Sequence, residues 1–350
     1  MSGNTRIVIL MALCAFARAA DLTIGSATAH PGEKATGVLT VPAGVDAATD
    51  IPVIVINGAA PGPTLALVAG AHGTEYASIL ALHKLAQSVE PASLTGALIV
   101  LPLLNVASFS LVVPHVNPVD GKNMNRFYPG KPDGTQTERI SWVVTRLVLE
   151  KCDYLIDLHG GDLDENLRGY AYWADTGNAR LDSTSLGMVL AFGLDHIIIQ
   201  KNRTPPPPGG PVTISRQAGS MGKPSVVAEA GHAGTTAAAD VDALVHGSLN
   251  VMRHLRMLPG AAPPVEHPVW LGNATVVAAE GNGVFYPLVV PDAYVQKGMR
   301  VGYVTDYVGE KTSDVIAPVT GAVIYIRAVP SLKKGDTLID IGEVVEGPAR

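Results

Sequence analysis

The sequence predicts an α/β fold, in which a mostly parallel sheet is covered by helices on both faces, followed by a small all-β module. Three observations carry this prediction. Near-continuous apolar runs, typical of fully buried strands, recur through the first 231 residues. Segments with helical periodicity separate most of these runs. After residue 258 the apolar runs become short and are separated by glycine and turn residues, and no helical segment is expected there.

The expected elements alternate along the chain. The strands are bounded by turn-forming residues and comprise residues 51–56, 64–70, 96–102, 152–159, 169–174, 196–200 and 224–231. The helices repeat apolar residues every three or four positions and comprise residues 75–89, 135–151, 183–193 and 238–258. In sheets of this kind, ligands bind beyond the carboxyl ends of the strands.

Three segments are expected from these patterns. Residues 1–19 have the pattern of a signal peptide, because Arg6 precedes an apolar run and residues 17–19 fit a small-x-small cleavage site. An N-terminal core strand or helix is the alternative. Residues 20–260 form the α/β domain, and a proline-rich linker leads into the β module at residues 261–350.

The composition excludes several classes of protein. Hydrophobic residues make up 47% of the chain and charged residues 16%, which allows a large core and argues against global disorder. The formal net charge of −6 argues against a general binder of nucleic acid or anionic membranes. No apolar run reaches the roughly 20 residues that span a bilayer. We therefore expect an exported protein, periplasmic or extracellular, that has no membrane association after signal cleavage.

The chain has two cysteines, and Cys14 lies within the expected signal peptide. Cys152 is then single, which excludes an internal disulfide. It lies in an apolar strand-like run, so we expect it to be a small core residue rather than a nucleophile.

A candidate metal site begins with His72 and Glu75, in the stretch AGAHGTEY that follows an apolar run. Residues at positions i and i+3, where a strand turns into a helix, can point at one ion, and catalytic zinc takes three such nitrogen and oxygen ligands. His159 ends another apolar run, LIDLH, and is the candidate third ligand. Asp157 can accept a hydrogen bond from a ligating histidine. The alternative is a surface turn that contains His and Glu by chance.

Four motifs carry a resemblance to a known family. The stretches GAHGTE, DGKNMNRFYPG, DLHGG and VVAEAG occur in this order and resemble the succinylglutamate desuccinylase/aspartoacylase family of zinc hydrolases, relatives of the zinc carboxypeptidases. The resemblance covers roughly residues 50–345. It implies a three-layer α/β/α sandwich around a mixed sheet, and one zinc ion per chain bound by His72, Glu75 and His159.

The resemblance also implies the remaining site residues. Glu229 corresponds to the catalytic glutamate of the family, and Asn125 and Arg126 correspond to the pair that binds a substrate carboxylate. Zinc lowers the pKa of a bound water toward about 7, so Glu229 can accept its proton and pass it to the departing amine. Arg126 offers a planar fork of donors to a carboxylate. The alternatives are an ion-paired strand-end acid for Glu229 and a structural role in a turn for Arg126.

The sequence departs from the family pattern at two places. Asn123 stands where many members have an aspartate that supports a zinc histidine, although it can still accept a hydrogen bond. The loop before Arg126 contains no arginine that would stabilise the oxyanion of the transition state. His115, Arg168 and Arg216 are the candidates to take its place.

The C-terminal module resembles the barrel-sandwich hybrid of biotinyl and lipoyl domains, notably in APVTGAVIYIRAVPSLKKGDTLIDIG. A carrier domain presents its modified lysine at the tip of a hairpin, where APVTGAV has none, so we expect no attached biotin or lipoate. Three roles stay open for the module: it forms a wall of the cleft, it mediates oligomer contacts, or it stabilises the fold.

These patterns predict a zinc-dependent hydrolase that cleaves an amide bond adjacent to a carboxylate, foremost by deacylating an N-acyl amino acid. Export favours an alternative, a carboxypeptidase that acts on short peptides such as those of the cell wall, and an ester substrate is also open. An inactive zinc-binding recognition protein is the alternative from another class, and the presence of Glu229 beside a full ligand set argues against it. Three points stay open: the acyl-group specificity, whether the protein forms a homo-oligomer, and which residue assists zinc.

Overall fold

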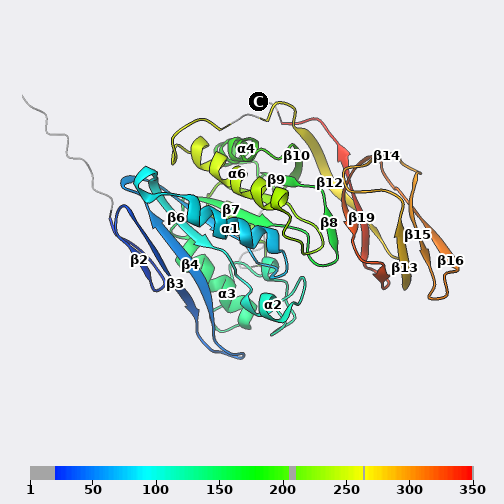
Figure 1. Cartoon of the computed structure of the whole chain (residues 1–350), viewed down its shortest axis with the longest axis horizontal. Coiled ribbons are helices and arrows are strands. Elements are labelled where there is room, and N and C mark those ends of the chain that lie inside the picture. Colours follow the sequence, from blue (N-terminus) through cyan, green and yellow to red (C-terminus); the bar gives the residue numbers. More distant parts are fainter. Residues whose placement is uncertain (1–19, 205–209, 263–264, 349–350) are drawn as a thin grey trace, which may run out of the picture.

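The computed structural model describes residues 20–204, 210–262 and 265–348. The expected signal peptide at residues 1–19 lies outside the described residues. Most strands belong to one large mixed sheet with helices packed on it (Figure 1). This arrangement confirms the predicted class, a mixed α/β fold.

The strands and helices have the following bounds. The strands are β1 (Leu22–Ile24), β2 (Ala27–Ala29), β3 (Glu33–Val41), β4 (Thr49–Asn57), β5 (Ala60–Val68), β6 (Thr95–Leu101), β7 (Tyr154–His159), β8 (Glu165–Leu167), β9 (Tyr170–Asp175), β10 (His196–Lys201), β11 (Ser225–Glu229), β12 (Val269–Ala278), β13 (Gly283–Pro287), β14 (Tyr294–Val295), β15 (Arg300–Thr305), β16 (Lys311–Ile316), β17 (Gly321–Arg327), β18 (Ser331–Leu332) and β19 (Thr337–Val344). The α-helices are α1 (Tyr76–Ser88), α2 (Val106–Leu111), α3 (Gln136–Val144), α4 (Ala179–Phe192), α5 (Ile214–Ser220) and α6 (Ala238–His254). Three shorter helical turns are η1 (Pro91–Ser93), η2 (Met124–Arg126) and the π-helical η3 (Thr145–Leu149).

In the described part of the chain, one sheet of thirteen strands has the order β14-β17-β19-β12-β10-β9-β11-β7-β5-β6-β4-β3, with β8 paired to β17. At its centre, β6, β5, β7 and β11 are successive parallel neighbours. β9 is antiparallel to β11 and parallel to β10, and β4 and β3 add antiparallel strands at the other edge. The carboxyl ends of the central strands therefore meet at one edge of the sheet.

Helices cover both faces of the sheet (Figure 1). Along β5, Leu65 and Leu67 pack into the core beneath α1, α4 and α6, whereas Ala66 and Val68 pack into the core beneath α3. Burial from both sides explains why the central strands are near-continuous apolar runs. None of the described helices is both long and apolar enough to cross a membrane.

Some elements differ from the prediction. The expected helix at residues 135–151 is divided, because α3 ends at Val144 and the chain continues as the π-helical turn η3. A capping box between Thr135 and Glu138 fixes the start of α3. The strands β1 to β3 and the helices α2 and α5 were not predicted, since they are too short or too polar to show a clear apolar period.

The described C-terminal residues, 265–348, form strands without helices. β12 pairs in parallel with β10 and antiparallel with β19, so the C-terminal strands extend the large sheet. The sheet β16-β15-β13-β18 packs against them around a core that includes Phe285, Val301 and Ile339. The β module is therefore joined to the α/β part by backbone hydrogen bonds.

Cys152 lies in the core, as predicted. It is fully buried, and burial raises the pKa of its thiol to about 11. A thiol in this state is protonated at neutral pH and is not a nucleophile.

Candidate active site

A cavity of about 660 Å³ lies beyond the carboxyl ends of β5, β7 and β11. His72 follows β5, His159 ends β7 and Glu229 ends β11, and all three side chains line the cavity. In the register of the sheet, Glu229 is the direct partner of His159. The parallel pairing of these strands thus brings together residues that are far apart in the sequence.

His72, Glu75 and His159 form a compact cluster in this cavity. One potential ligand atom from each residue lies within 4.8 Å of the other two. Nδ1 of His72 is 2.6 Å from Oε1 of Glu75, and Nδ1 of His159 is 3.0 Å from Oε2 of the same carboxylate. Two imidazole nitrogens and one carboxylate are a ligand set that fits zinc and leaves one position for water.

The turn between β5 and α1 holds His72 and Glu75 side by side. Gly70 has a φ of +64°, a conformation that favours glycine, and turns the chain at the end of the strand. Gly73 packs so closely on α2 that an added Cβ atom would lie 2.2 Å from the backbone nitrogen of Phe109. The backbone of this turn therefore sets the separation of the two side chains.

Glu75 is the anionic member of the cluster. Burial opposes ionisation of Glu75, but His72 and His159 outweigh burial and lower its pKa to about 2. Burial also acts to lower the pKa of His72, but the charge of Glu75 prevails and the pKa is raised. Glu75 is therefore a buried carboxylate at neutral pH, which is the form that binds metal.

The second ring nitrogens of the two histidines have polar partners. Nε2 of His72 lies 3.1 Å from Oδ1 of Asn123. The same oxygen accepts a hydrogen bond from the backbone N–H of Asn125 at 2.9 Å, which orients the amide of Asn123. Nε2 of His159 lies 3.3 Å from Oδ1 of the fully buried Asp157. The contact with Asn123 keeps Nδ1 of His72 directed at the cluster, as a ligating histidine requires. Oδ1 of Asp157 forms no hydrogen bond with the described residues, so its contact with His159 is one of charge.

Glu229 is the second carboxylate of the site. Burial raises its pKa well above the usual value; the charge of His159 opposes this shift, and the carboxylates of Glu75, Glu165 and Asp157 add to it. Glu229 therefore holds its proton readily, and positive charge nearby favours its ionised form. A carboxyl group in such a setting suits general acid–base catalysis.

Asn125 and Arg126 lie together on the turn η2, but their surroundings differ. Asn125 is buried: its Oδ1 accepts a hydrogen bond from the backbone N–H of Ile214 at 2.8 Å, and its Nδ2 lies 3.0 Å from Nε2 of His159. Arg126 is exposed, lines the cavity and donates a hydrogen bond to its neighbour's carbonyl. Within the described residues it forms no ion pair, so Arg126 is the member of the pair that is free to bind a substrate anion.

Three residues were candidates to replace the missing arginine, and only His115 lines the cavity. The guanidinium of Arg168 instead binds Asp195 at 2.7 Å and Asp292 at 3.0 Å. Arg216 lines a different, adjoining cavity. Neither arginine thus lies at the metal cluster.

His115 is tied to the loop after β7. Its Nε2 lies 2.7 Å from Oδ1 of Asp164, and its backbone N–H donates to Asp162 at 2.8 Å. The hydrogen bond to Asp164, with the charges of Asp162 and Glu165, outweighs partial burial and raises the pKa of His115 to about 9. His115 is therefore an imidazolium at neutral pH whose Nε2 proton is already donated.

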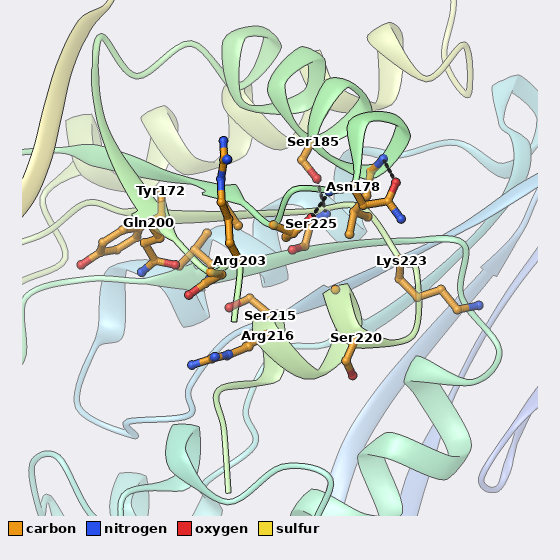
Figure 2. Close-up of a pocket in the computed structure, with 16 residues that line it drawn as sticks. Tyr172, Asn178, Ser185, Gln200, Arg203, Ser215, Arg216, Ser220, Lys223 and Ser225 are labelled. Carbon is orange, nitrogen blue, oxygen red and sulfur yellow. Dashed lines mark hydrogen bonds between the residues drawn. The ribbon is translucent and has the colours of Figure 1, made fainter. Parts of the chain in front are cut away.

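The adjoining cavity, of about 300 Å³, lies among α4, α5 and the strands β9 to β11 (Figure 2). Tyr172, Gln200 and Ser215 line both cavities, which are therefore neighbours at these residues. Arg216 donates from Nη2 to the carbonyl of Thr204 at 2.8 Å, and its buried Nε has no hydrogen-bond partner among the described residues. No sequence motif predicts this cavity, although basic residues flank the proline-rich stretch of the chain.

The C-terminal strands form one wall of the cavity that contains the three candidate metal ligands (the metal cavity), which was one of the three open roles of the module. Tyr325 and Arg327 on β17 and Asp340 on β19 line the cavity. Arg327 binds Asp164 and Asp336, both at 3.2 Å. No sequence motif signals these residues, because they reach the cavity through the pairing of β19 with β12 and of β17 with β19 and β8.

The fold and the site define a mixed α/β protein with a two-histidine, one-carboxylate cluster at the carboxyl ends of its central strands. Residues 61–255 match the sequence model of the succinylglutamate desuccinylase/aspartoacylase catalytic domain. The protein belongs to the succinylglutamate desuccinylase/aspartoacylase family, as the four motifs indicate.

Similar proteins extend the match to most of the chain. The N-alpha-acetyl-L-2,4-diaminobutyric acid deacetylase of Halomonas elongata is 29% identical over 306 residues, which are 85% of this chain and 86% of that protein. The product-bound structure of the ectoine utilization protein EutE (DoeB) from Ruegeria pomeroyi has a TM-score of 0.82 at 26% identity, covering 91% of this chain and 98% of that one. A succinylglutamate desuccinylase from a Silicibacter species has a TM-score of 0.81, also at 26% identity and with the same coverage.

Proposed function

We propose that this protein is a zinc-dependent hydrolase that removes the acyl group from an N-acyl amino acid. The observation that carries the proposal is the cluster of His72, Glu75 and His159 beside Glu229 in one cavity. Two of the similar proteins are named for the removal of an acetyl or a succinyl group from an amino acid, which supports the same reaction here.

The reaction follows from the positions of the side chains. The ligand cluster would hold the zinc through two Nδ1 atoms and one carboxylate. When bound, zinc supplies a polarised scissile carbonyl and a water of lowered pKa. Glu229 accepts the proton of the attacking water and donates it to the departing amine nitrogen. Asn123 contacts Nε2 of His72, which leaves Nδ1 of that ring directed at the metal position.

Arg126 orients the substrate in this proposal. Its guanidinium lines the cavity and is free to bind a carboxylate through two parallel hydrogen bonds. Such an anchor holds the adjacent amide in a fixed geometry for attack. The substrate would therefore carry a free carboxylate next to the scissile amide.

Rates of hydrolysis of N-acetyl amino acids and of their α-amides test the proposal. We expect the acids to be hydrolysed, a chelator to abolish hydrolysis and added zinc to restore it. Amidation should lower kcat/KM by about tenfold or more, because a hydrogen bond to a charged group contributes ~1.5–3 kcal/mol. Equal rates for acid and amide would contradict the role of Arg126, and no hydrolysis of any N-acyl amino acid would contradict the deacylase.

The adjoining cavity favours a second candidate, the removal of a carboxy-terminal residue from a short peptide. Its volume of about 300 Å³, next to the 660 Å³ of the metal cavity, offers room beyond a single acylated amino acid. Dipeptides and tripeptides in the same assay separate the two activities.

We also propose export, from the signal-peptide pattern at residues 1–19. A mature protein that begins at Ala20 would support export.

A further inference from the structure

The C-terminal wall of the metal cavity contains a carboxylate that the proposed reaction does not use. Asp340 on β19 is the direct partner of Tyr325 on β17. Direct cross-strand partners project from the same face of a sheet, and both residues line the cavity. Asp340 is thus exposed to the same cavity as His159 and Glu229.

The arginine of this wall is fully occupied. Arg327 binds Asp164 and Asp336, each at 3.2 Å, and its Nε donates to the carbonyl of Ser331 at 2.7 Å. Its guanidinium therefore does not neutralise Asp340.

Asp340 has no comparable partner. Its Oδ1 is buried and forms no hydrogen bond with any described residue. Burial raises the pKa of Asp340 to about 6, and no charged neighbour counteracts burial. Because a buried carboxylate is costly unless it is paired, this position favours a positively charged group brought in from outside.

Asp340 and Arg126, the proposed anchor for the substrate carboxylate, line the same cavity as Tyr172. Burial, together with the charges of Glu229 and Asp340, raises the pKa of the Tyr172 hydroxyl, and the charge of Arg126 lowers it. Glu229 lines this cavity as well. A substrate in this space meets a cationic anchor, a group that transfers protons and a separate anionic position.

We propose that Asp340 binds the positively charged side chain of the substrate, so that the enzyme prefers N-acyl derivatives of basic amino acids. The inference rests on the proposed function, because the α-carboxylate of the substrate is taken to bind Arg126. A side-chain ammonium pairs with Asp340 through a charge-assisted hydrogen bond. A neutral side chain of the same length leaves Asp340 buried and unpaired.

N-acetylornithine and N-acetylnorleucine test the preference. Their side chains have the same length and differ in a terminal ammonium against a methyl group. We expect kcat/KM of the wild-type protein to be about tenfold or more higher for the ornithine derivative, from one hydrogen bond between charged groups. N-acetyllysine and N-acetylarginine show whether a longer ammonium or a guanidinium serves as well.

Asp340→Asn removes the charge and keeps the size of the side chain. This variant should lose the preference, so that kcat/KM for the ornithine derivative falls to about the value for the norleucine derivative. Glu343→Gln is the matched control, because Glu343 lies on the same strand, is exposed and does not line the cavity. Both variants change the net charge equally, so a preference retained only in Glu343→Gln assigns the effect to Asp340 itself.

Two results would overturn the inference: equal kcat/KM for both derivatives in the wild type, or an equal loss on both derivatives in Asp340→Asn. Calorimetric binding of free ornithine and norleucine to the purified protein adds a readout that does not depend on turnover. We expect Asp340→Asn to weaken the binding of ornithine only; unchanged ornithine binding would also overturn the inference. If no N-acyl amino acid is hydrolysed, the proposed function fails, and the binding comparison still decides the role of Asp340.

Discussion

His159 uses both of its ring nitrogens, because Nδ1 faces Glu75 and Nε2 faces Asp157. His159→Ala removes one of the three proposed zinc ligands, so we expect the zinc content of the purified protein to fall from about one ion per chain to a small fraction. Mass spectrometry of the metal measures this change. His83→Ala, at an exposed position of α1, is the control. Full zinc content in His159→Ala would remove this residue from the site.

Glu229 allows metal binding to be separated from proton transfer. Glu229→Gln keeps the shape of the side chain but cannot accept a proton. We expect zinc content to stay at the wild-type level while kcat falls by a factor of about 10² to 10⁴, the usual contribution of general acid–base catalysis. Metal analysis and kinetics on the same preparation test this. An unchanged kcat would show that another group accepts the proton.

At the scale of elements, the loop after α2 is held against the loop after β7. His115 makes the connection, with a φ of 62° that is uncommon for a residue other than glycine. Asp162, Asp164 and Glu165 face its ring from the opposite loop. The loop that precedes the turn η2 is therefore positioned by ion pairs in which His115 must be charged.

This connection makes stability depend on pH. The pKa of His115 is raised to about 9 from an ordinary 6.5, so its contribution is complete below about pH 6.5 and is lost as the pH rises through 9. Its side chain is 41% exposed, and solvent screening reduces the effect. We expect the Tm of the wild type to fall more than that of His115→Gln between pH 6.5 and pH 9. If thermal unfolding showed that the Tm of both proteins changes with pH in the same way, the result would contradict this role.

At the scale of the whole molecule, the C-terminal strands complete the core of the α/β part. Tyr170 and Ile198 share a buried cluster with Leu271, Ala322 and Ile324 of the C-terminal strands. Backbone hydrogen bonds between β10 and β12 continue the sheet through this cluster.

A chain that ends at residue 262 should therefore be destabilised, since it exposes this apolar cluster and the edge of β10. We expect a lower Tm and lower solubility than for the full chain, measured by thermal unfolding and by the soluble yield. A chain that ends at residue 346, beyond β19, is the control and should behave as the full chain. An unchanged Tm after truncation at residue 262 would show that the α/β part folds independently.

The sequence by itself determined the class of fold and the local setting of the candidate ligands. A strand covered on both faces is apolar throughout, so buried strands can be predicted from the sequence. The expected strands at residues 64–70 and 152–159 lie close to β5 and β7. The sequence therefore predicts that His72 and His159 lie at strand ends. The four motifs added the family and, through it, Glu229, Asn125 and Arg126.

Only the tertiary structure decided which of these groups meet and which are free. The pairing of β7 with β11 sets Glu229 opposite His159, and the pairing of β17 with β8 brings the C-terminal strands to the cavity. The same packing engages Arg168 with Asp292 and leaves Oδ1 of Asp340 without a hydrogen-bond partner among the described residues. Local periodicity does not encode such contacts, because they join residues far apart in the sequence and depend on the order and register of strands in the complete sheet.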